Sequence, residues 1–219
     1  MMYLDQLRKS FHSTVFETAA RFTVAVGGGG ATVWGVPGVD LNTGGGAPGY
    51  AKTTIDTTLP AFKVFTNSPR FYANWHLKTL GSVGSYYIGM GNVTAGILGH
   101  TFKDPHIGFK ILVVGGVATL YASQADNATE TAVALTAVVV NQVVEGFIQV
   151  NGGQNGTVIS VDYYYRLDGG DWSAPVRLTG TLPTAAFLLN STWCQVSCSN
   201  DGAALAQQEV IASSAWYSR

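Results

Sequence analysis

The chain has 219 residues and few charges, because its 12 Lys and Arg residues and 13 Asp and Glu residues make up only 11% of it. Soluble domains usually contain about 25% charged residues. The net charge of −1 argues against a nucleic-acid partner, which needs a clustered basic face. The longest apolar run, from Val133 to Val140, is far shorter than the ~20 residues of a membrane-spanning helix. We therefore expect an unusually neutral surface or a surface that a partner covers.

The first 20 residues are expected to form a short N-terminal arm or helix ahead of a single β-sandwich domain at 21–219. Apolar side chains recur there at a spacing of three or four residues, which favours a helix. The same side chains could instead order as an extended arm against a partner. The segment lacks the apolar stretch and the cleavage site of a secretory signal. The candidate assembly residues of this arm are Leu4, Leu7, Phe11 and Val15.

The rest of the chain alternates apolar and polar residues with the period of a half-buried strand. In Arg70–Leu80, Phe71 and Trp75 are on one side and Tyr72 is on the other. Two strand-like runs flank Gly115-Gly116, which predicts a hairpin. About ten such strands follow one another with no helix between them, as in an antiparallel sandwich or jelly roll. The glycine-rich stretch at 24–50 is interpreted as short strands and turns of the same fold.

Several segments together resemble the concanavalin A-like, laminin-G-like jelly roll. They are VDLNTGGG (39–46), PRFYANWHLKTL (69–80) with YYIGMGN (86–92), HIGFKILVVGGVATLYAS (106–123), EGFIQVNGGQNGTVISVDYYYRLDGGDW (145–172) and IASSAWY (211–217). The resemblance spans residues 20–219 and implies an all-β, antiparallel two-sheet jelly-roll sandwich. The family contains lectins, glycan hydrolases, adhesion modules and viral structural proteins, so fold alone does not decide function. A copy with an N-terminal arm, few charges and no signal peptide most resembles a bacteriophage virion component.

No residue set predicts an enzyme, a metal or another cofactor. A retaining glycan hydrolase needs two carboxylates about 5 Å apart, which alternate positions of one strand can supply. No strand of this chain has two acids in that pattern. His100, Asp104 and His106 share a loop, but their spacing matches no recognised ligand set. Cys194 and Cys198 are interpreted as reduced cysteines of the core or of a loop.

The aromatic residues are the one binding signal. Tyr163, Tyr164 and Tyr165 are consecutive, so Tyr164 faces away from the other two. Tyr86 and Tyr87 are divided between faces in the same way. Aromatic side chains can stack on sugar rings and are enriched in protein interfaces, but they also pack within ordinary sheets. The candidate glycan or protein contacts are Tyr86, Tyr164 and Trp172.

Three functions compete on this basis. The first is a non-enzymatic viral structural protein, a capsid decoration (cement) or fibre jelly roll. It would be located in the virion, bind capsid proteins and self-associate, for example as a trimer. Few charges suit it, because the cores of interfaces are depleted in charge. The second is a lectin-like module that binds host-surface glycans. The third, a glycan-cleaving enzyme, is the weakest because acids are scarce.

Overall fold

The computed structural model describes residues 12–14, 22–34, 38–44, 50–55, 70–91, 103–152, 158–183, 192–200 and 207–216. Regular structure in these ranges consists of strands. Their bounds are β1 (His12–Thr14), β2 (Phe22–Gly27), β3 (Ala31–Trp34), β4 (Val39–Asn42), β5 (Tyr50–Ile55), β6 (Arg70–Thr79), β7 (Val83–Gly91), β8 (His106–Val114), β9 (Val117–Ala125), β10 (Glu130–Val138), β11 (Val143–Gly152), β12 (Val158–Leu167), β13 (Val176–Leu178), β14 (Thr192–Ser199) and β15 (Gln207–Trp216).

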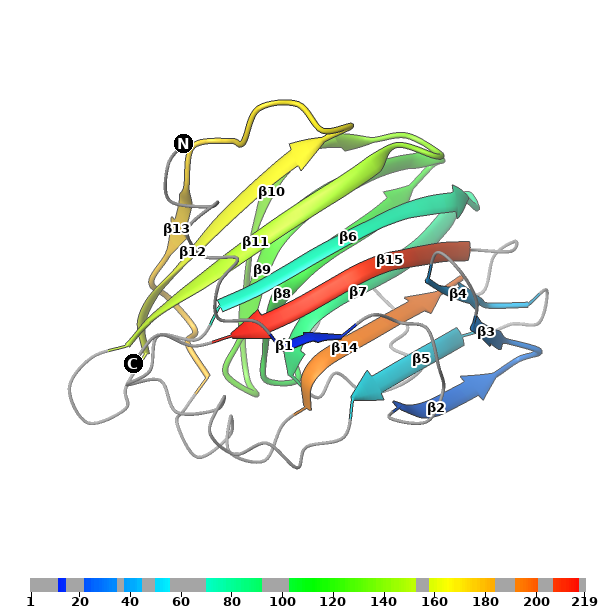
Figure 1. Cartoon of the computed structure of the whole chain (residues 1–219), viewed down its shortest axis with the longest axis horizontal. Coiled ribbons are helices and arrows are strands. Elements are labelled where there is room, and N and C mark those ends of the chain that lie inside the picture. The colour runs from blue at the N-terminus through cyan, green and yellow to red at the C-terminus, as the bar shows by residue number, and fades with distance from the viewer. Residues whose placement is uncertain are drawn as a thin grey trace.

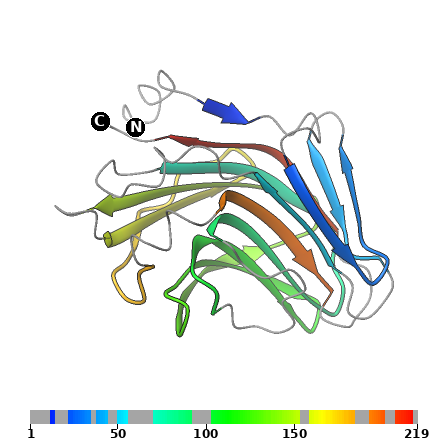
Figure 2. The same cartoon turned by 90° about the horizontal axis from the view of Figure 1, so that it is seen from below.

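The strands form two antiparallel sheets that lie as two layers (Figures 1 and 2). The eight-stranded sheet has the order β13-β12-β11-β6-β15-β4-β3, and β1 pairs with β15 beside this path. The seven-stranded sheet has the order β10-β9-β8-β7-β14-β5-β2. Strands distant in sequence are neighbours in both sheets, such as β6 with β15 and β7 with β14. The predicted all-β, antiparallel two-sheet jelly-roll sandwich is confirmed.

The core lies between the two sheets and follows from the period-two pattern. In β6 the side chains of Phe71, Ala73, Trp75 and Leu77 are buried, and the residues between them are half-buried. The ring of Trp75 packs against Phe109 of the other sheet at a centroid distance of 5.8 Å. Large apolar side chains buried in this way supply most of the free energy that favours folding.

The Gly115-Gly116 hairpin forms as predicted between β8 and β9. Both glycines have positive φ angles, 59° and 78°. A two-residue turn of this kind matches the twist of the flanking strands and favours glycine. The register continues directly from the turn, with Val114 opposite Val117. The sequence was sufficient to predict this hairpin because the two glycines that indicate a turn are themselves the residues of the turn.

The N-terminal expectations are met only in part. His12–Thr14 is a strand that pairs with residues 213–215 of β15, so at these three residues the chain is extended and the helical alternative is wrong. Pairing with β15 decides the conformation here despite the helical spacing of the sequence. The candidate arm residues Leu4, Leu7, Phe11 and Val15 lie outside the described residues.

Both cysteines lie on β14. Cys198 is buried among the core residues, as expected of a core cysteine. The side chain of Cys194 lies outside the described residues.

In the described ranges, no helix has the length and apolarity to span a membrane.

Candidate functional site on the outer face of the eight-stranded sheet

A row of three aromatic side chains crosses the outer face of the eight-stranded sheet. Phe147 of β11 is paired with Tyr164 of β12 on one side and with Tyr72 of β6 on the other. Paired residues of antiparallel strands are on the same face of the sheet. The neighbouring Tyr163 is buried in the core, so this face points away from the other sheet. We call Tyr72, Phe147 and Tyr164 the aromatic row.

The aromatic row is only partly accessible. Phe147 is 4% exposed, whereas Tyr72 and Tyr164 are half-buried. The rings of Phe147 and Tyr164 are tilted at 48° with centroids 5.6 Å apart. Burial and the nearby Asp162 carboxylate raise the pKa of Tyr164, so the phenol stays neutral and can donate a hydrogen bond at physiological pH. The accessible part of the row is therefore its two ends, the half-buried rings of Tyr72 and Tyr164 with their hydroxyl groups.

An ion pair flanks the aromatic row on one side. Glu145 Oε2 accepts hydrogen bonds from Arg166 Nη2 and from the Tyr72 hydroxyl, each at 2.7 Å. The Arg166 guanidinium lies over the ring of Trp172, 4.9 Å from its centroid. Burial and Glu145 raise the pKa of Tyr72 far above its ordinary value. These contacts fix the orientation of Arg166 between a carboxylate and an aromatic ring.

A second ion pair flanks the row on the other side. Arg177 of β13 donates to both oxygens of Asp162, from Nε at 2.7 Å and from Nη2 at 2.8 Å. The Asn151 amide also donates to Asp162, at 3.0 Å. These hydrogen bonds, chiefly those from Arg177, hold the pKa of Asp162 below its ordinary value. The carboxylate is thus ionised and fully occupied by its neighbours.

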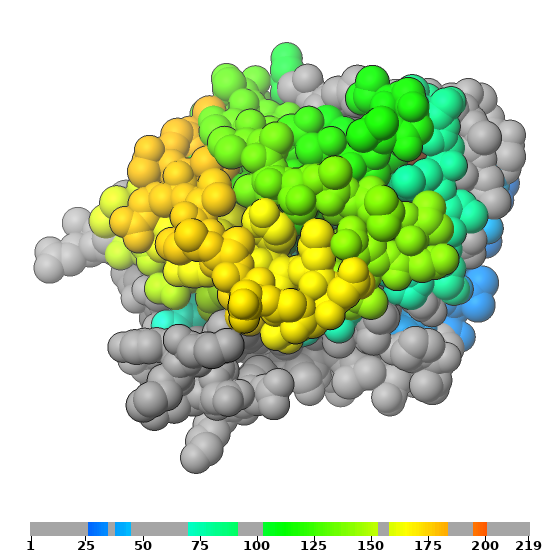
Figure 3. Space-filling model, turned by 90° about the horizontal axis from the view of Figure 1, so that it is seen from above, coloured from blue at the N-terminus to red at the C-terminus, as the bar shows by residue number. Residues whose placement is uncertain are grey.

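The structure brings together two of the three predicted contact residues. Tyr164 and Arg166 alternate on one strand and share a face, and Trp172 reaches the same place by stacking on Arg166. The connection that carries Trp172, between β12 and β13, lies at the surface in Figure 3, where it is yellow beside the green atoms of β9–β11. Arg166 and Arg177 were not among the residues predicted to form contacts. The alternation of polar and aromatic residues in β12 is the signal that could have found Arg166.

The expectation that Tyr86 makes a surface contact is corrected. Tyr86 is 1% exposed, and its hydroxyl donates to the Thr79 carbonyl oxygen at 2.9 Å. Its partners in the sheet, Ile111 and Cys198, are buried core residues. Tyr87 does face the other way, but it is equally buried. The two tyrosines are divided between faces as predicted, but neither face exposes them.

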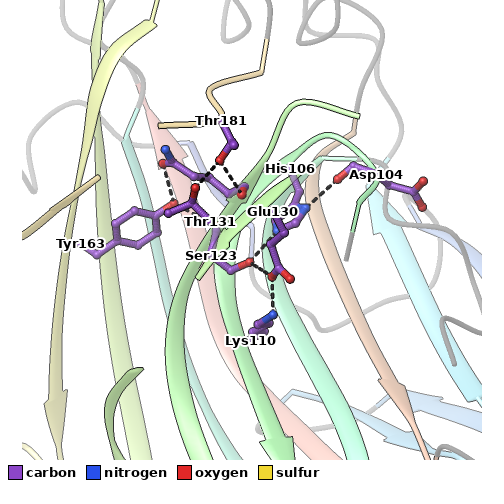
Figure 4. Close-up of polar contacts among 9 residues, drawn as sticks. Asp104, His106, Lys110, Ser123, Glu130, Thr131, Tyr163 and Thr181 are labelled. Carbon is purple, nitrogen blue, oxygen red and sulfur yellow. Dashed lines mark hydrogen bonds and ion pairs between the residues drawn. The ribbon is translucent and has the colours of Figure 1, made fainter. Parts of the chain in front are cut away.

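A buried polar network lies on the face of the seven-stranded sheet that points away from the eight-stranded sheet (Figure 4). Ser123 Oγ is 2.7 Å from His106 Nε2 and 2.5 Å from Glu130 Oε1. Lys110 forms an ion pair with the same oxygen of Glu130. The other ring nitrogen of His106, Nδ1, is 2.6 Å from the Asp104 carbonyl oxygen. A carbonyl oxygen only accepts, so Nδ1 carries a proton.

This network brings a serine and a histidine into contact, but both are buried where a substrate would not reach them. Ser123 and His106 are both 0% exposed. The Ser123 hydroxyl donates its single proton to the Glu130 carboxylate. Burial lowers the pKa of His106 to about 4. A nucleophilic serine must reach its substrate, so in the described conformation this pair is part of the protein interior.

The described residues contain no group of three or more His, Cys, Asp or Glu side chains arranged to hold a metal ion. Of the loop residues considered from the sequence, His106 is committed to Ser123 and Asp104. His100 lies outside the described residues.

The two sheets and their strand order define a lectin-like β-sandwich. No family model and no curated protein matches the chain. Among solved structures, peanut lectin is 9% identical, with a TM-score of 0.60 over 93% of this chain and 94% of the lectin. Similarity over this much of the chain shows that it has the legume-lectin-like, concanavalin A-like fold.

Two of the similar structures are bacteriophage proteins. One is a conserved carbohydrate esterase from the Shiga toxin-encoding phage phi24B, 11% identical, with a TM-score of 0.51 over 96% of this chain and 99% of the esterase. The other is the CBM2 module of the evolved Dit protein of Lactobacillus casei BL23 phage J-1, 10% identical, with a TM-score of 0.50 over 96% of each chain. Identities this low establish the shared fold alone.

Proposed function

We propose that the protein is a carbohydrate-binding module that acts by binding and not by catalysis. The observation that carries this proposal is the aromatic row on the outer face, flanked by hydrogen-bonding side chains and by Trp172. Saccharide sites need a ring surface for stacking and polar groups that orient the hydroxyls. The lectin-like fold supports the proposal, although it does not choose the face that binds.

The hydrogen bonds made by the two carboxylates beside the aromatic row favour binding over catalysis. Glu145 and Asp162 are each held by an arginine and by at least one further donor. A glycosidase needs one carboxyl group that can release a proton and a second that is free to attack or to activate water. Neither of these two carboxylates is available for such a role. The buried position of Ser123 argues in the same way against an esterase.

A glycan array and calorimetric titration with the best-bound glycan test the proposal. Tyr164→Ala and Trp172→Ala are each expected to weaken binding by about tenfold, because each removes a ring surface from the site. Ile159→Ala is the matched control, since Ile159 is an exposed residue of the same strand and lies outside the aromatic row. Binding that is unchanged in both aromatic variants, or an array without a hit, would overturn the proposal.

A structural role in a bacteriophage virion is the second candidate function, and one observation favours it. β10 is an edge strand that pairs with β9 alone among the described strands. Its middle residues Ala132, Val133 and Ala134 are exposed and uncharged. Natural proteins usually protect such an edge with charges, because it can pair with a strand of another chain. A capsid decoration or fibre protein would use it for self-association within the virion.

Light scattering after size-exclusion chromatography tests this second function. Wild-type protein is expected to be an oligomer and Val133→Lys a monomer, since the substitution adds a charge to the edge. Val26→Lys is the control: Val26 is 46% exposed on β2, at the opposite edge of the same sheet, and its substitution should leave the oligomer intact. A wild-type monomer at high protein concentration would exclude assembly through β10.

A further inference from the structure

We propose that the ligand of the outer-face site is an anionic saccharide, one that carries a carboxylate, phosphate or sulfate group. This inference rests on the proposed carbohydrate-binding function and adds the charge of the ligand. It is carried by Arg166 and Arg177, which flank the aromatic row and are each more exposed to solvent than the carboxylate that they bind.

Both ion pairs are asymmetric in their exposure to solvent. The Arg177 side chain is 63% exposed, and that of its partner Asp162 is 6% exposed. The Arg166 side chain is 29% exposed, compared with 10% for Glu145. Each pair is neutral in sum, but its positive half is at the surface and its negative half is beneath. A ligand that approaches this face therefore meets guanidinium groups before it meets carboxylates.

The arginines also keep donors for a ligand. A guanidinium has five N–H groups, and Arg177 uses one on Nε and one on Nη2 to bind Asp162. Arg166 binds Glu145 through Nη2, and its Nε is buried, so Nη1 is the nitrogen that it can offer to a ligand. The Trp172 ring covers a face of this guanidinium, and N–H groups donate in the guanidinium plane. Planar donor pairs of this kind match carboxylate and phosphate oxygens.

The spacing of the two arginines suits a sugar stacked on Tyr164. Asp162, Tyr164 and Arg166 occupy alternate positions of β12 on one face, and Arg177 pairs with Asp162 across the strand boundary. Two residues of a strand advance about 6.6 Å, so Arg166 lies on one side of Tyr164 along β12, and Arg177, one strand across at the level of Asp162, lies on the other. An acidic substituent on either side of the stacked sugar would therefore meet a guanidinium group.

The experiment compares matched glycans that differ in charge, namely sialyllactose with lactose, and glucuronic-acid-terminated with glucose-terminated oligosaccharides. Wild-type protein should bind the acidic member of each pair at least about tenfold more tightly. That preference should decrease as the salt concentration rises, because the attraction is between charges near the surface. The salt dependence requires no variant and so does not depend on the folding of one.

Substitutions then assign the preference to residues. Arg177→Gln and Arg166→Gln should each reduce binding of the acidic glycans by a larger factor than binding of the neutral ones, so the acidic preference should shrink. Arg177→Lys keeps the charge but loses the paired donors, so it should give an intermediate affinity. Lys78→Gln is the control, because Lys78 is a cation of the same sheet that is paired with Asp40 away from the row. Circular dichroism and the thermal midpoint confirm that each variant is folded.

The outcomes separate this inference from the proposed function. Equal binding of acidic and neutral glycans that still requires Tyr164 would overturn the charge inference and leave carbohydrate binding in place. An acidic preference that survives both arginine substitutions would also overturn it. No binding of any glycan would overturn the proposed function itself.

Discussion

The Nε2 atom of His106 lies 2.7 Å from the hydroxyl oxygen of Ser123, and neither side chain is exposed to solvent. Their contact is made deep in a sheet that also buries Lys110 and Glu130. A charged imidazole would lose its hydration there, which is why burial lowers the pKa of His106 to about 4 from an ordinary value of 6.5. This relationship makes the fold sensitive to acid.

The stability of the protein should therefore fall as the pH falls from 6.5 towards 4. The unfolded chain binds a proton at His106 near pH 6.5, whereas the folded chain binds it only near pH 4. The stabilisation is complete above pH 6.5 and is lost through this window, in total roughly 3 kcal/mol. Urea unfolding at pH 7.5, 5.5 and 4.5 measures it. The free energy of unfolding should fall more steeply with falling pH in the wild type than in His106→Gln, and the difference is the contribution of His106. Equal slopes in the two proteins would contradict the prediction.

Breaking the buried Lys110–Glu130 ion pair should be strongly destabilising. The two side chains are 2% and 6% exposed, so Lys110→Met removes the positive charge that balances a buried carboxylate. The expected loss in the free energy of unfolding is about 3–5 kcal/mol. Lys78→Met is the matched control, because the Lys78–Asp40 pair is 31% and 24% exposed and should cost only about 0–1 kcal/mol. Similar losses in the two variants would contradict this account.

Replacing Gly146 by alanine should disturb the core. A Cβ atom at this position would lie 2.5 Å from Phe109 Cε2 and 3.0 Å from the Trp75 ring. Overpacking of this kind costs about 1–3 kcal/mol. In Gly180→Ala the nearest atom is Thr131 Oγ1 at 3.5 Å, an ordinary contact, so this control should keep the wild-type midpoint. Thermal unfolding measures both, and an unchanged midpoint for Gly146→Ala would show that the Phe109 ring moves aside.

Removing the Tyr163 hydroxyl should show how much one buried hydrogen bond contributes to the free energy of unfolding. It donates to the Ser123 carbonyl oxygen at 2.9 Å, in a completely buried position. Tyr163→Phe removes the donor and keeps the ring, which packs edge-on against Phe109. The expected loss is about 1 kcal/mol in urea unfolding. A loss several times larger would mean that the hydroxyl also supports the neighbouring polar network.

The sequence predicted those parts of the fold that depend on near neighbours in the chain. The alternation in Arg70–Leu80 put Phe71 and Trp75 on the same side of a half-buried strand, and that side is the buried one; Gly115-Gly116 located a hairpin. The helical spacing of the first 20 residues failed at His12–Thr14, where pairing with β15 decides the conformation. The prediction of a surface contact at Tyr86 failed for a related reason. A period of two shows that alternate residues are on opposite faces of a strand, but it does not show whether both faces are covered.

What the sequence determined by itself is an all-β sandwich with few charges and with Tyr164 on the face opposite to Tyr163. The period of two is a local property of a strand, so it can be recognised in one chain. Only the tertiary structure decided that Tyr164 lies beside Phe147 and Tyr72, and that Arg166 and Arg177 lie above buried carboxylates. Those relationships depend on strand order and register, which long-range packing sets across residues far apart in the sequence.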